Sequence, residues 1–129
     1  MDWEFQLLNW IQENCHQDIL TTILRWITML GDGGILWIVL SLILWIPQKT
    51  RKCGVSMSMA LLFCGLLGNL ILKPWVGRIR PYDINTAIEL LLPPLSDFSF
   101  PSGHTYAAFA GAVTLFCFYK KSGVAALIL

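Results

Sequence analysis

Three basic residues follow a long apolar run closely: Lys73, Arg78 and Arg80, in the segment Lys-Pro-Trp-Val-Gly-Arg-Ile-Arg-Pro. Two prolines and a glycine interrupt a regular helix there, so the cations lie on an irregular chain. Lysine offers a point charge and arginine a two-pronged donor, a combination that suits a phosphate group. Basic residues at a helix end also commonly meet lipid head groups, and for this cluster alone that interpretation stays open.

A second cluster, Pro101-Ser102-Gly103-His104, opens another apolar run. Ser102 is placed to cap a helix, and the free backbone N–H groups of Gly103 and His104 would then form an anion site at the positive end of the helix dipole. A histidine in that first turn can hand a proton to a leaving oxygen near neutral pH. A capped helix with an interfacial histidine is the simpler alternative. A Ser–His nucleophile pair is disfavoured, because two residues of one helical turn rarely align for attack.

Three uncharged stretches predict the helices that position these clusters. The stretch Cys53–Leu72 holds no Asp, Glu, Lys or Arg, and at 1.5 Å per residue it matches the roughly 30 Å of a bilayer core. A second stretch, Gly33–Gln48, is short for a span, so residues 28–31 must add turns to it. The third, Phe98–Tyr119, is predicted to be helical from near Gly103.

The first 30 residues differ, because apolar side chains recur at helical spacing between polar ones. We expect an amphipathic helix that lies in the membrane interface. A polar-ended first helix packed on the bundle is the alternative. His16 falls in this segment, and we expect it to be a solvated surface residue. The sequence therefore predicts an all-α fold, a polytopic membrane helical bundle with an N-terminal interfacial helix.

The composition favours a membrane protein over several other classes. Hydrophobic residues make up 56% of the chain and charged residues 13%, with a mean hydropathy of +0.63, whereas soluble domains are about a quarter charged. A net charge of +1 leaves no basic surplus for a nucleic-acid partner. The four cysteines are widely spaced, which indicates neither a zinc site nor a disulfide framework.

The basic residues also predict an orientation. Short loops rich in lysine and arginine face the cytoplasm, and five of the nine basic residues fall in two such places, at 49–52 and 120–121. The loop from Lys73 to Pro101 then faces out of the cell. Its own basic residues violate the rule, which suggests that they serve a purpose other than topology.

Taken together, the two clusters resemble the first two signature motifs of the type-2 phosphatidic acid phosphatase superfamily. Lys73, Arg80 and Pro81 correspond to the first motif, and the segment Pro101-Ser102-Gly103-His104 corresponds to the second. Asn69 and the segment 28–34 also resemble the corresponding parts of small bacterial members of this superfamily. The resemblance covers the whole chain, and its specific part is confined to about residues 69–104.

The resemblance implies hydrolysis of a phosphate ester or pyrophosphate. Lys73, Arg80 and the backbone around Ser102 and Gly103 would bind the phosphate, and His104 would protonate the leaving oxygen. A histidine of a third motif would attack phosphorus and form a phosphohistidine that water then cleaves. Neither a metal nor another cofactor is expected, because fixed cations stabilise the phosphoryl oxygens.

The third motif, Ser-Arg followed by a histidine and an aspartate, has no counterpart in residues 1–129. The sequence stops at Leu129, within a fourth apolar run that begins at Val124. We therefore expect a single membrane-embedded, phosphatase-like domain over residues 1–129 that is incomplete at its C-terminus and lacks the nucleophile.

The expected substrate is a lipid-linked phosphate or pyrophosphate, of the undecaprenyl pyrophosphate or phosphatidic acid type. Soluble acid phosphatases and vanadate-dependent haloperoxidases share these motifs, but an apolar run that ends at Lys73 puts the cluster at the membrane surface. The partners are then this lipid and the bilayer, and the sequence leaves the oligomeric state open. The alternative is a catalytically inactive membrane protein that binds anionic lipid head groups. A channel is disfavoured, because the run before Lys73 holds too few polar residues to line a pore.

Overall fold

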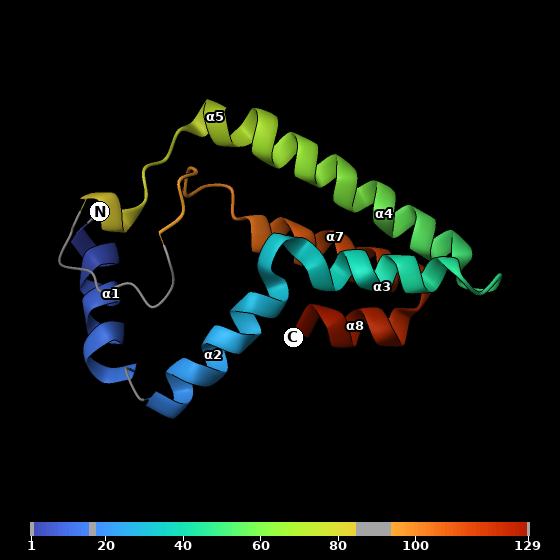
Figure 1. Cartoon of the computed structure of the whole chain (residues 1–129), viewed down its shortest axis with the longest axis horizontal. Coiled ribbons are helices and arrows are strands. Elements are labelled where there is room, and N and C mark those ends of the chain that lie inside the picture. The colour runs from blue at the N-terminus through green and yellow to red at the C-terminus, as the bar shows by residue number, and fades with distance from the viewer. Residues whose placement is uncertain (1, 16–17, 85–93, 129) are drawn as a thin grey trace.

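The computed structural model describes residues 2–15, 18–84 and 94–128, and every regular element among them is helical (Figure 1). The all-α prediction is therefore confirmed. His16 and part of the loop after Tyr82 lie outside the described residues. The elements, in chain order, are α1 (Asp2–Cys15), α2 (Asp18–Gly31), the 3₁₀ turn η1 (Asp32–Gly34), α3 (Ile35–Trp45), α4 (Arg51–Leu66), the π-helical η2 (Leu67–Leu72), α5 (Lys73–Val76), α6 (Pro81–Ile84), α7 (Gly103–Phe118) and α8 (Lys120–Ile128).

The longest helical segment joins α4, η2 and α5 without a break. Among the described residues, the run Arg51–Ile84 alone is long and apolar enough to cross a membrane by length and composition, and its most apolar 18-residue window has a mean hydropathy of 2.0. Only 11% of its most apolar window is buried inside the protein, so its apolar side chains face outward, where lipid would cover them. This agrees with the span predicted at Cys53–Leu72.

A π-helical turn interrupts this segment just before the first motif. The backbone N–H of Lys73 bonds to the carbonyl of Gly68, five residues back, instead of four as in an α-helix. The wider turn changes the face of the helix on which the following residues lie. Lys73, which follows this turn, is buried, although it stands at the end of a segment whose other side chains are mostly exposed.

Helix α3 pairs with α4 through a tight turn at residues 46–50, and a glycine makes their close approach possible. A Cβ on Gly54 would lie 2.7 Å from the backbone oxygen of Ser41. With 11 residues, α3 is only about 16 Å long. The turns expected from residues 28–31 belong to α2 instead, because the chain bends at Gly34, whose φ is 71°. The prediction that they continue the same helix was wrong.

Helix α7 packs on α4 and α3, and α8 folds back along α7. Aromatic rings sit directly on glycines at these contacts. A Cβ on Gly111 would lie 2.0 Å from Cε3 of Trp37, and one on Gly68 would lie 2.8 Å from Cε1 of Tyr106. These glycines therefore let large rings fill the space between helices.

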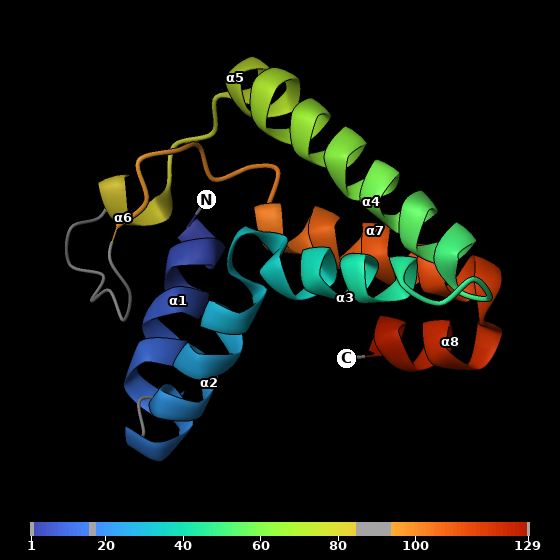
Figure 2. The same cartoon turned by 45° about the vertical axis from the view of Figure 1, so that its right-hand side comes forward.

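The N-terminal region forms two helices instead of the single one expected. Helix α1 runs crosswise to α3 and α7 (Figures 1 and 2), and α2 reaches the bundle through its contacts with α3 and η1. Trp3, Trp10 and Trp26 on these helices are exposed. Exposed tryptophans are common at a membrane interface, and the interfacial placement of this region stays a prediction.

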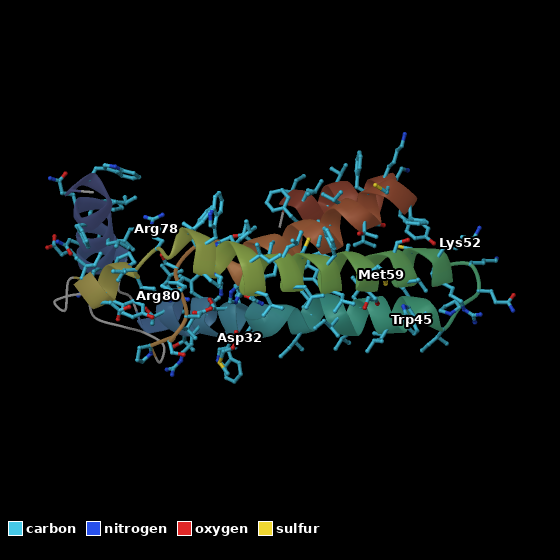
Figure 3. All side chains as sticks on the ribbon, turned by 90° about the horizontal axis from the view of Figure 1, so that it is seen from above. Asp32, Trp45, Lys52, Met59, Arg78 and Arg80 are labelled. Atoms are coloured by element: carbon cyan, nitrogen blue, oxygen red, sulfur yellow. The ribbon has the colours of Figure 1, made fainter. Side chains whose placement is uncertain are left out.

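Two loops meet at the end of the bundle opposite α5. The hydroxyl of Tyr119 donates a hydrogen bond to the backbone oxygen of Lys49 at 3.3 Å, which ties the α7–α8 junction to the α3–α4 turn. Lys52 and Arg80 lie at opposite ends of the molecule (Figure 3). The two basic loops of the sequence thus share one end, away from both motifs.

Candidate functional site

Lys73 and Arg80 converge on one carboxylate, that of Asp97. The ammonium group of Lys73 forms an ion pair with Oδ2 of Asp97, and Nη2 of Arg80 donates to Oδ1 at 2.5 Å. Nε of Arg80 also donates to the backbone oxygen of Asp97, at 2.8 Å. Both cations are largely buried, with side chains 11% and 19% exposed. Their charged groups therefore point at the same place.

The break in the helix after Lys73 makes this convergence possible. The N–H of Gly77 bonds to the Lys73 carbonyl at 2.9 Å and ends α5. Gly77 has a φ of 57°, a left-handed conformation that glycine adopts without steric cost. The chain then reverses toward the bundle, so that Arg80 faces Lys73 instead of continuing along the helix axis.

The loop that carries Asp97 is fastened on both sides of this residue. Ser99 donates from its backbone N–H and its hydroxyl to the carbonyl of Arg78, at 2.9 and 3.0 Å. The Tyr82 hydroxyl accepts from the N–H of Leu95 at 2.9 Å and donates to the Leu95 carbonyl at 3.0 Å. The two motifs are therefore held together across the intervening residues.

The second motif forms the helix start that the sequence predicts. Ser102 has an extended backbone, and its hydroxyl accepts from the N–H of Thr105 at 3.4 Å, as a helix cap does. Nε2 of His104 lies 3.3 Å from the backbone oxygen of Thr28 in α2. Such a bond requires the proton on Nε2, and it links the histidine to the N-terminal region.

One polar cavity of about 310 Å³ connects these parts, and all five predicted site residues line it. Lys73 and Arg80 form one side, and Ser102, Gly103 and His104 at the start of α7 form another. Five further residues with polar side chains also line it: Asp32, Asn69, Asp97, Ser99 and Tyr106. Two cations and a helix N-terminus on one cavity are suited to bind a multiply charged oxyanion.

The two neighbouring cations also set the ionisation of the Asp97 carboxyl group. Its hydrogen bonds with Lys73, and next with Arg80, hold the pKa of this carboxyl below its ordinary value. Asp97 is therefore ionised at neutral pH. Among the described residues, no group of three or more His, Cys, Asp or Glu side chains is arranged to hold a metal ion.

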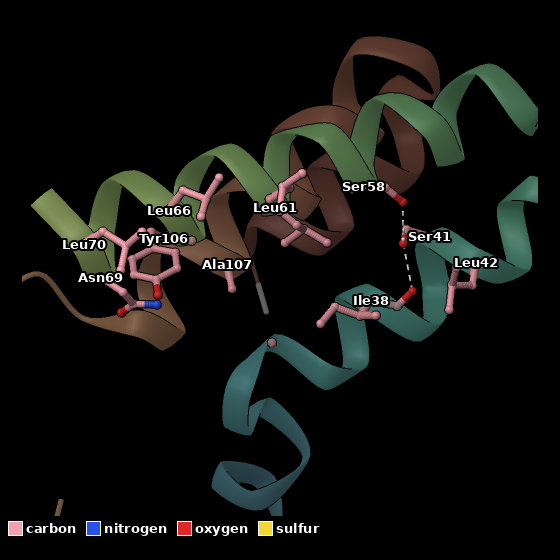
Figure 4. Close-up of a pocket in the computed structure, with 13 residues that line it drawn as sticks. Ile38, Ser41, Leu42, Ser58, Leu61, Leu66, Asn69, Leu70, Tyr106 and Ala107 are labelled. Atoms are coloured by element: carbon pink, nitrogen blue, oxygen red, sulfur yellow. Dashed lines mark hydrogen bonds between the residues drawn. The ribbon is translucent and has the colours of Figure 1, made fainter. Parts of the chain in front are cut away.

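A larger apolar groove of about 510 Å³ adjoins the polar cavity (Figure 4). Its walls are mainly leucines of α3, α4 and η2 together with Ile38, and it shares Asn69, Tyr106 and Ala107 with the cavity. The hydroxyl of Ser58 donates to Ser41, at 3.0 Å, and that of Ser41 donates to the Ile38 carbonyl, at 2.7 Å. These hydroxyls are satisfied by protein partners, so the groove is an apolar surface that leads to a charged cavity.

Comparison with known proteins identifies the family. The profile of the PAP2 superfamily matches residues 51–129, which include both motifs and all five predicted site residues. The chain belongs to the PAP2 superfamily. A curated relative, an undecaprenyl-diphosphatase of Sulfolobus acidocaldarius, is 34% identical over 79 residues, which is 61% of this chain and 38% of that relative's length. No solved structure matches the chain with significance.

The cavity of this PAP2 chain also holds residues that the sequence analysis did not assign to a site. Asp97 was only one of several acids in the outer loop, and nothing in its spacing marks it as the partner of both cations. Asn69 and Asp32 do belong to segments that carried the family resemblance. Asp32 lines the cavity although it precedes the residues matched to the PAP2 profile. The first helices thus add a wall to a site whose motifs lie elsewhere.

Proposed function

We propose that this PAP2 chain is the phosphate-binding part of a membrane lipid phosphatase that hydrolyses a lipid-linked phosphate or pyrophosphate. The observation that supports this most directly is the meeting of Lys73, Arg80 and the start of α7 on one cavity. Residues of this type stabilise the charge of a phosphoryl group in its transition state without a metal.

In the proposed reaction, Lys73, Arg80 and the backbone of Ser102 and Gly103 bind the phosphoryl oxygens. A histidine attacks phosphorus, and the bond from phosphorus to the leaving oxygen breaks. That oxygen belongs to the lipid alcohol in a monoester and bridges the two phosphates in a pyrophosphate, and His104 gives it a proton. Water then cleaves the phosphohistidine and releases phosphate. The attacking histidine belongs to a motif that residues 1–129 do not contain, so these residues account for binding and for protonation of the leaving oxygen.

The apolar groove supports a lipid as the substrate. A polyprenyl or acyl chain lying along α3 and α4 would place its phosphate in the polar cavity, because the two spaces share Asn69, Tyr106 and Ala107. The name of the Sulfolobus relative, undecaprenyl-diphosphatase, agrees with this class. We further propose that the chain passes through the membrane more than once, with α4 and η2 as the full-length span and the shorter α3 and α7 packed beside it. The cavity would face outward, because the basic loops at 49–52 and 120–121 lie at the other end of the bundle.

The test measures phosphate release from undecaprenyl diphosphate and phosphatidic acid in detergent. Turnover is assayed on the protein that the complete reading frame encodes, and orthovanadate binding on that protein and on residues 1–129. His104→Ala should lower turnover by about 10²-fold or more and leave orthovanadate bound. Arg80→Lys should nearly abolish turnover, because lysine cannot reproduce the forked donor.

A different outcome would favour the second candidate, a protein that binds anionic head groups without hydrolysis. In that case neither the unsubstituted protein nor any variant releases phosphate from either substrate. Arg80→Lys would then weaken lipid binding only slightly. Turnover by residues 1–129 alone, abolished by His104→Ala, would contradict the proposal that the nucleophile lies in a third motif.

A further inference from the structure

The carboxylate of Asp97 is bound between the two cations in the way that a phosphoryl group would be. One oxygen pairs with the ammonium of Lys73 and the other with the guanidinium of Arg80. Phosphate and carboxylate present oxygens of similar geometry to arginine, which is why the same fork binds either. The cations of the proposed site are therefore already occupied by an anion of the chain itself.

The charges of these three residues determine how strongly the site can attract the phosphoryl group of a substrate. Lys73 and Arg80 together carry two positive charges, of which ionised Asp97 neutralises one. A dianionic phosphoryl group added beside Asp97 would bring three negative charges against two positive ones within a few ångströms. Like charges at that separation repel strongly in a partly buried site. Binding of the phosphoryl group and the observed position of the Asp97 carboxylate thus compete with each other.

The burial of the three side chains shows which of them can move. The Asp97 side chain is 47% exposed, against 11% for Lys73 and 19% for Arg80. The Asp97 carboxylate has a direct path to solvent, whereas the cations are enclosed. Its backbone is held by Arg80 and, through Leu95 and Ser99, by the neighbouring turns. A rotation of the Asp97 side chain therefore frees the ammonium of Lys73 and Nη2 of Arg80, while Nε of Arg80 still holds the loop in place.

We propose that Asp97 is a further residue of the phosphate site, an internal ligand whose carboxylate occupies the place of the substrate's phosphoryl oxygens and is exchanged for them on binding. This inference rests on the proposed function of the cavity. While the site is empty, Asp97 keeps Lys73 and Arg80 aimed at one point, and it lowers the affinity for every anion that must displace it.

The experiment measures the dissociation constant of orthovanadate for the detergent-solubilised 129-residue chain. Asp97→Asn keeps the size of the side chain and removes its charge, and it should bind orthovanadate about tenfold more tightly. Asp97→Glu keeps the charge and should therefore bind orthovanadate less tightly than Asp97→Asn does. Asp83→Asn is the matched control, because it removes an equal charge from exposed α6, outside the cavity lining, and should change the affinity little.

Asp97→Ser serves as a second neutral variant, and circular dichroism and elution volume establish that each variant is folded. Unchanged or weaker binding in both folded neutral variants would overturn the inference, and it would leave the proposed function standing as long as Arg80→Gln still abolishes binding. An equal gain in Asp83→Asn would also overturn it, because the effect would then be one of general charge. If orthovanadate binding does not depend on Arg80 in any variant, the proposed function fails as well.

Discussion

The helical bundle and the polar cavity at its end are built on different physical principles. In the bundle, rings of tryptophan and tyrosine lie against glycines, as Trp37 does against Gly111, and shape decides what fits. At the cavity, Lys73, Arg80 and Asp97 are joined by charge across irregular chain. The difference implies that changes in the bundle act on stability, and that changes at the cavity act mainly on anion binding.

The largest effect is expected where the bundle has no spare space. In Gly111→Ala, the new Cβ would lie 2.0 Å from Cε3 of Trp37, and we expect a loss of about 2–3 kcal/mol in the free energy of unfolding. Gly65→Ala on α4 is the matched control, because nothing lies within 4 Å of its Cβ, and it should be neutral or slightly stabilising. Denaturation in detergent, followed by circular dichroism, measures both. Equal losses in the two variants would show that tight packing does not distinguish Gly111.

The opposite pattern is expected at the cavity. Lys73→Gln removes one of the two cations and should weaken orthovanadate binding about tenfold, or about 1.4 kcal/mol. Its effect on the unfolding free energy should be smaller than that of Gly111→Ala, because the bundle helices do not pack through this ammonium group. Lys52→Gln, at the far end of the molecule (Figure 3), removes the same charge and is the control for binding. A comparable loss of binding in Lys52→Gln would contradict the assignment of the site.

Ser102 lies where the two regions meet, and its variants can separate them. Ser102→Ala removes the helix cap and should cost about 0.5 kcal/mol, the lower end of the usual range, because the capping bond is 3.4 Å long. Ser102→Asp should restore the cap, but its negative charge should repel an anion from the cavity. Compared with Ser102→Ala, Ser102→Asp should therefore be more stable to thermal unfolding and bind orthovanadate more weakly. If stability and orthovanadate affinity change in the same direction in Ser102→Ala and Ser102→Asp, helix capping and anion binding cannot be separated at this residue.

The smallest expected effect is on the pH dependence of stability. The pKa of Asp97 is lower in the folded chain than its unfolded value of about 4, so its ion pairs contribute stability above that value. This contribution is lost as the pH falls through the lower, folded pKa. Since Asp97 is partly exposed, the change should be small. Melting temperatures measured from about pH 6 to pH 3 should fall less in Asp97→Asn than in the parent chain, and identical slopes would contradict the assignment.

Much of the architecture follows from local patterns in the sequence. The span at Cys53–Leu72 and the start of α7 at Ser102 were both predictable, because an uncharged run and a capping residue act through the nearest few residues. The bend between α2 and α3 was not predicted; it occurs at the left-handed Gly34, where α7 packs so closely that an added Cβ would lie 3.2 Å from Cβ of Ala107. The split of the N-terminal region into α1 and α2 likewise had no clear local signal.

The sequence by itself predicted the candidate residues of an anion site and the family they resemble, because Lys73, Arg80, Ser102, Gly103 and His104 carry their chemistry in their types and spacing. Only the tertiary structure decided that these residues surround one cavity, since the two motifs are joined through long-range contacts such as that of Ser99 with Arg78. It also revealed Asp97 between the two cations. An ion pair between residues 24 positions apart depends on how the chain folds back, and no local pattern encodes that distance.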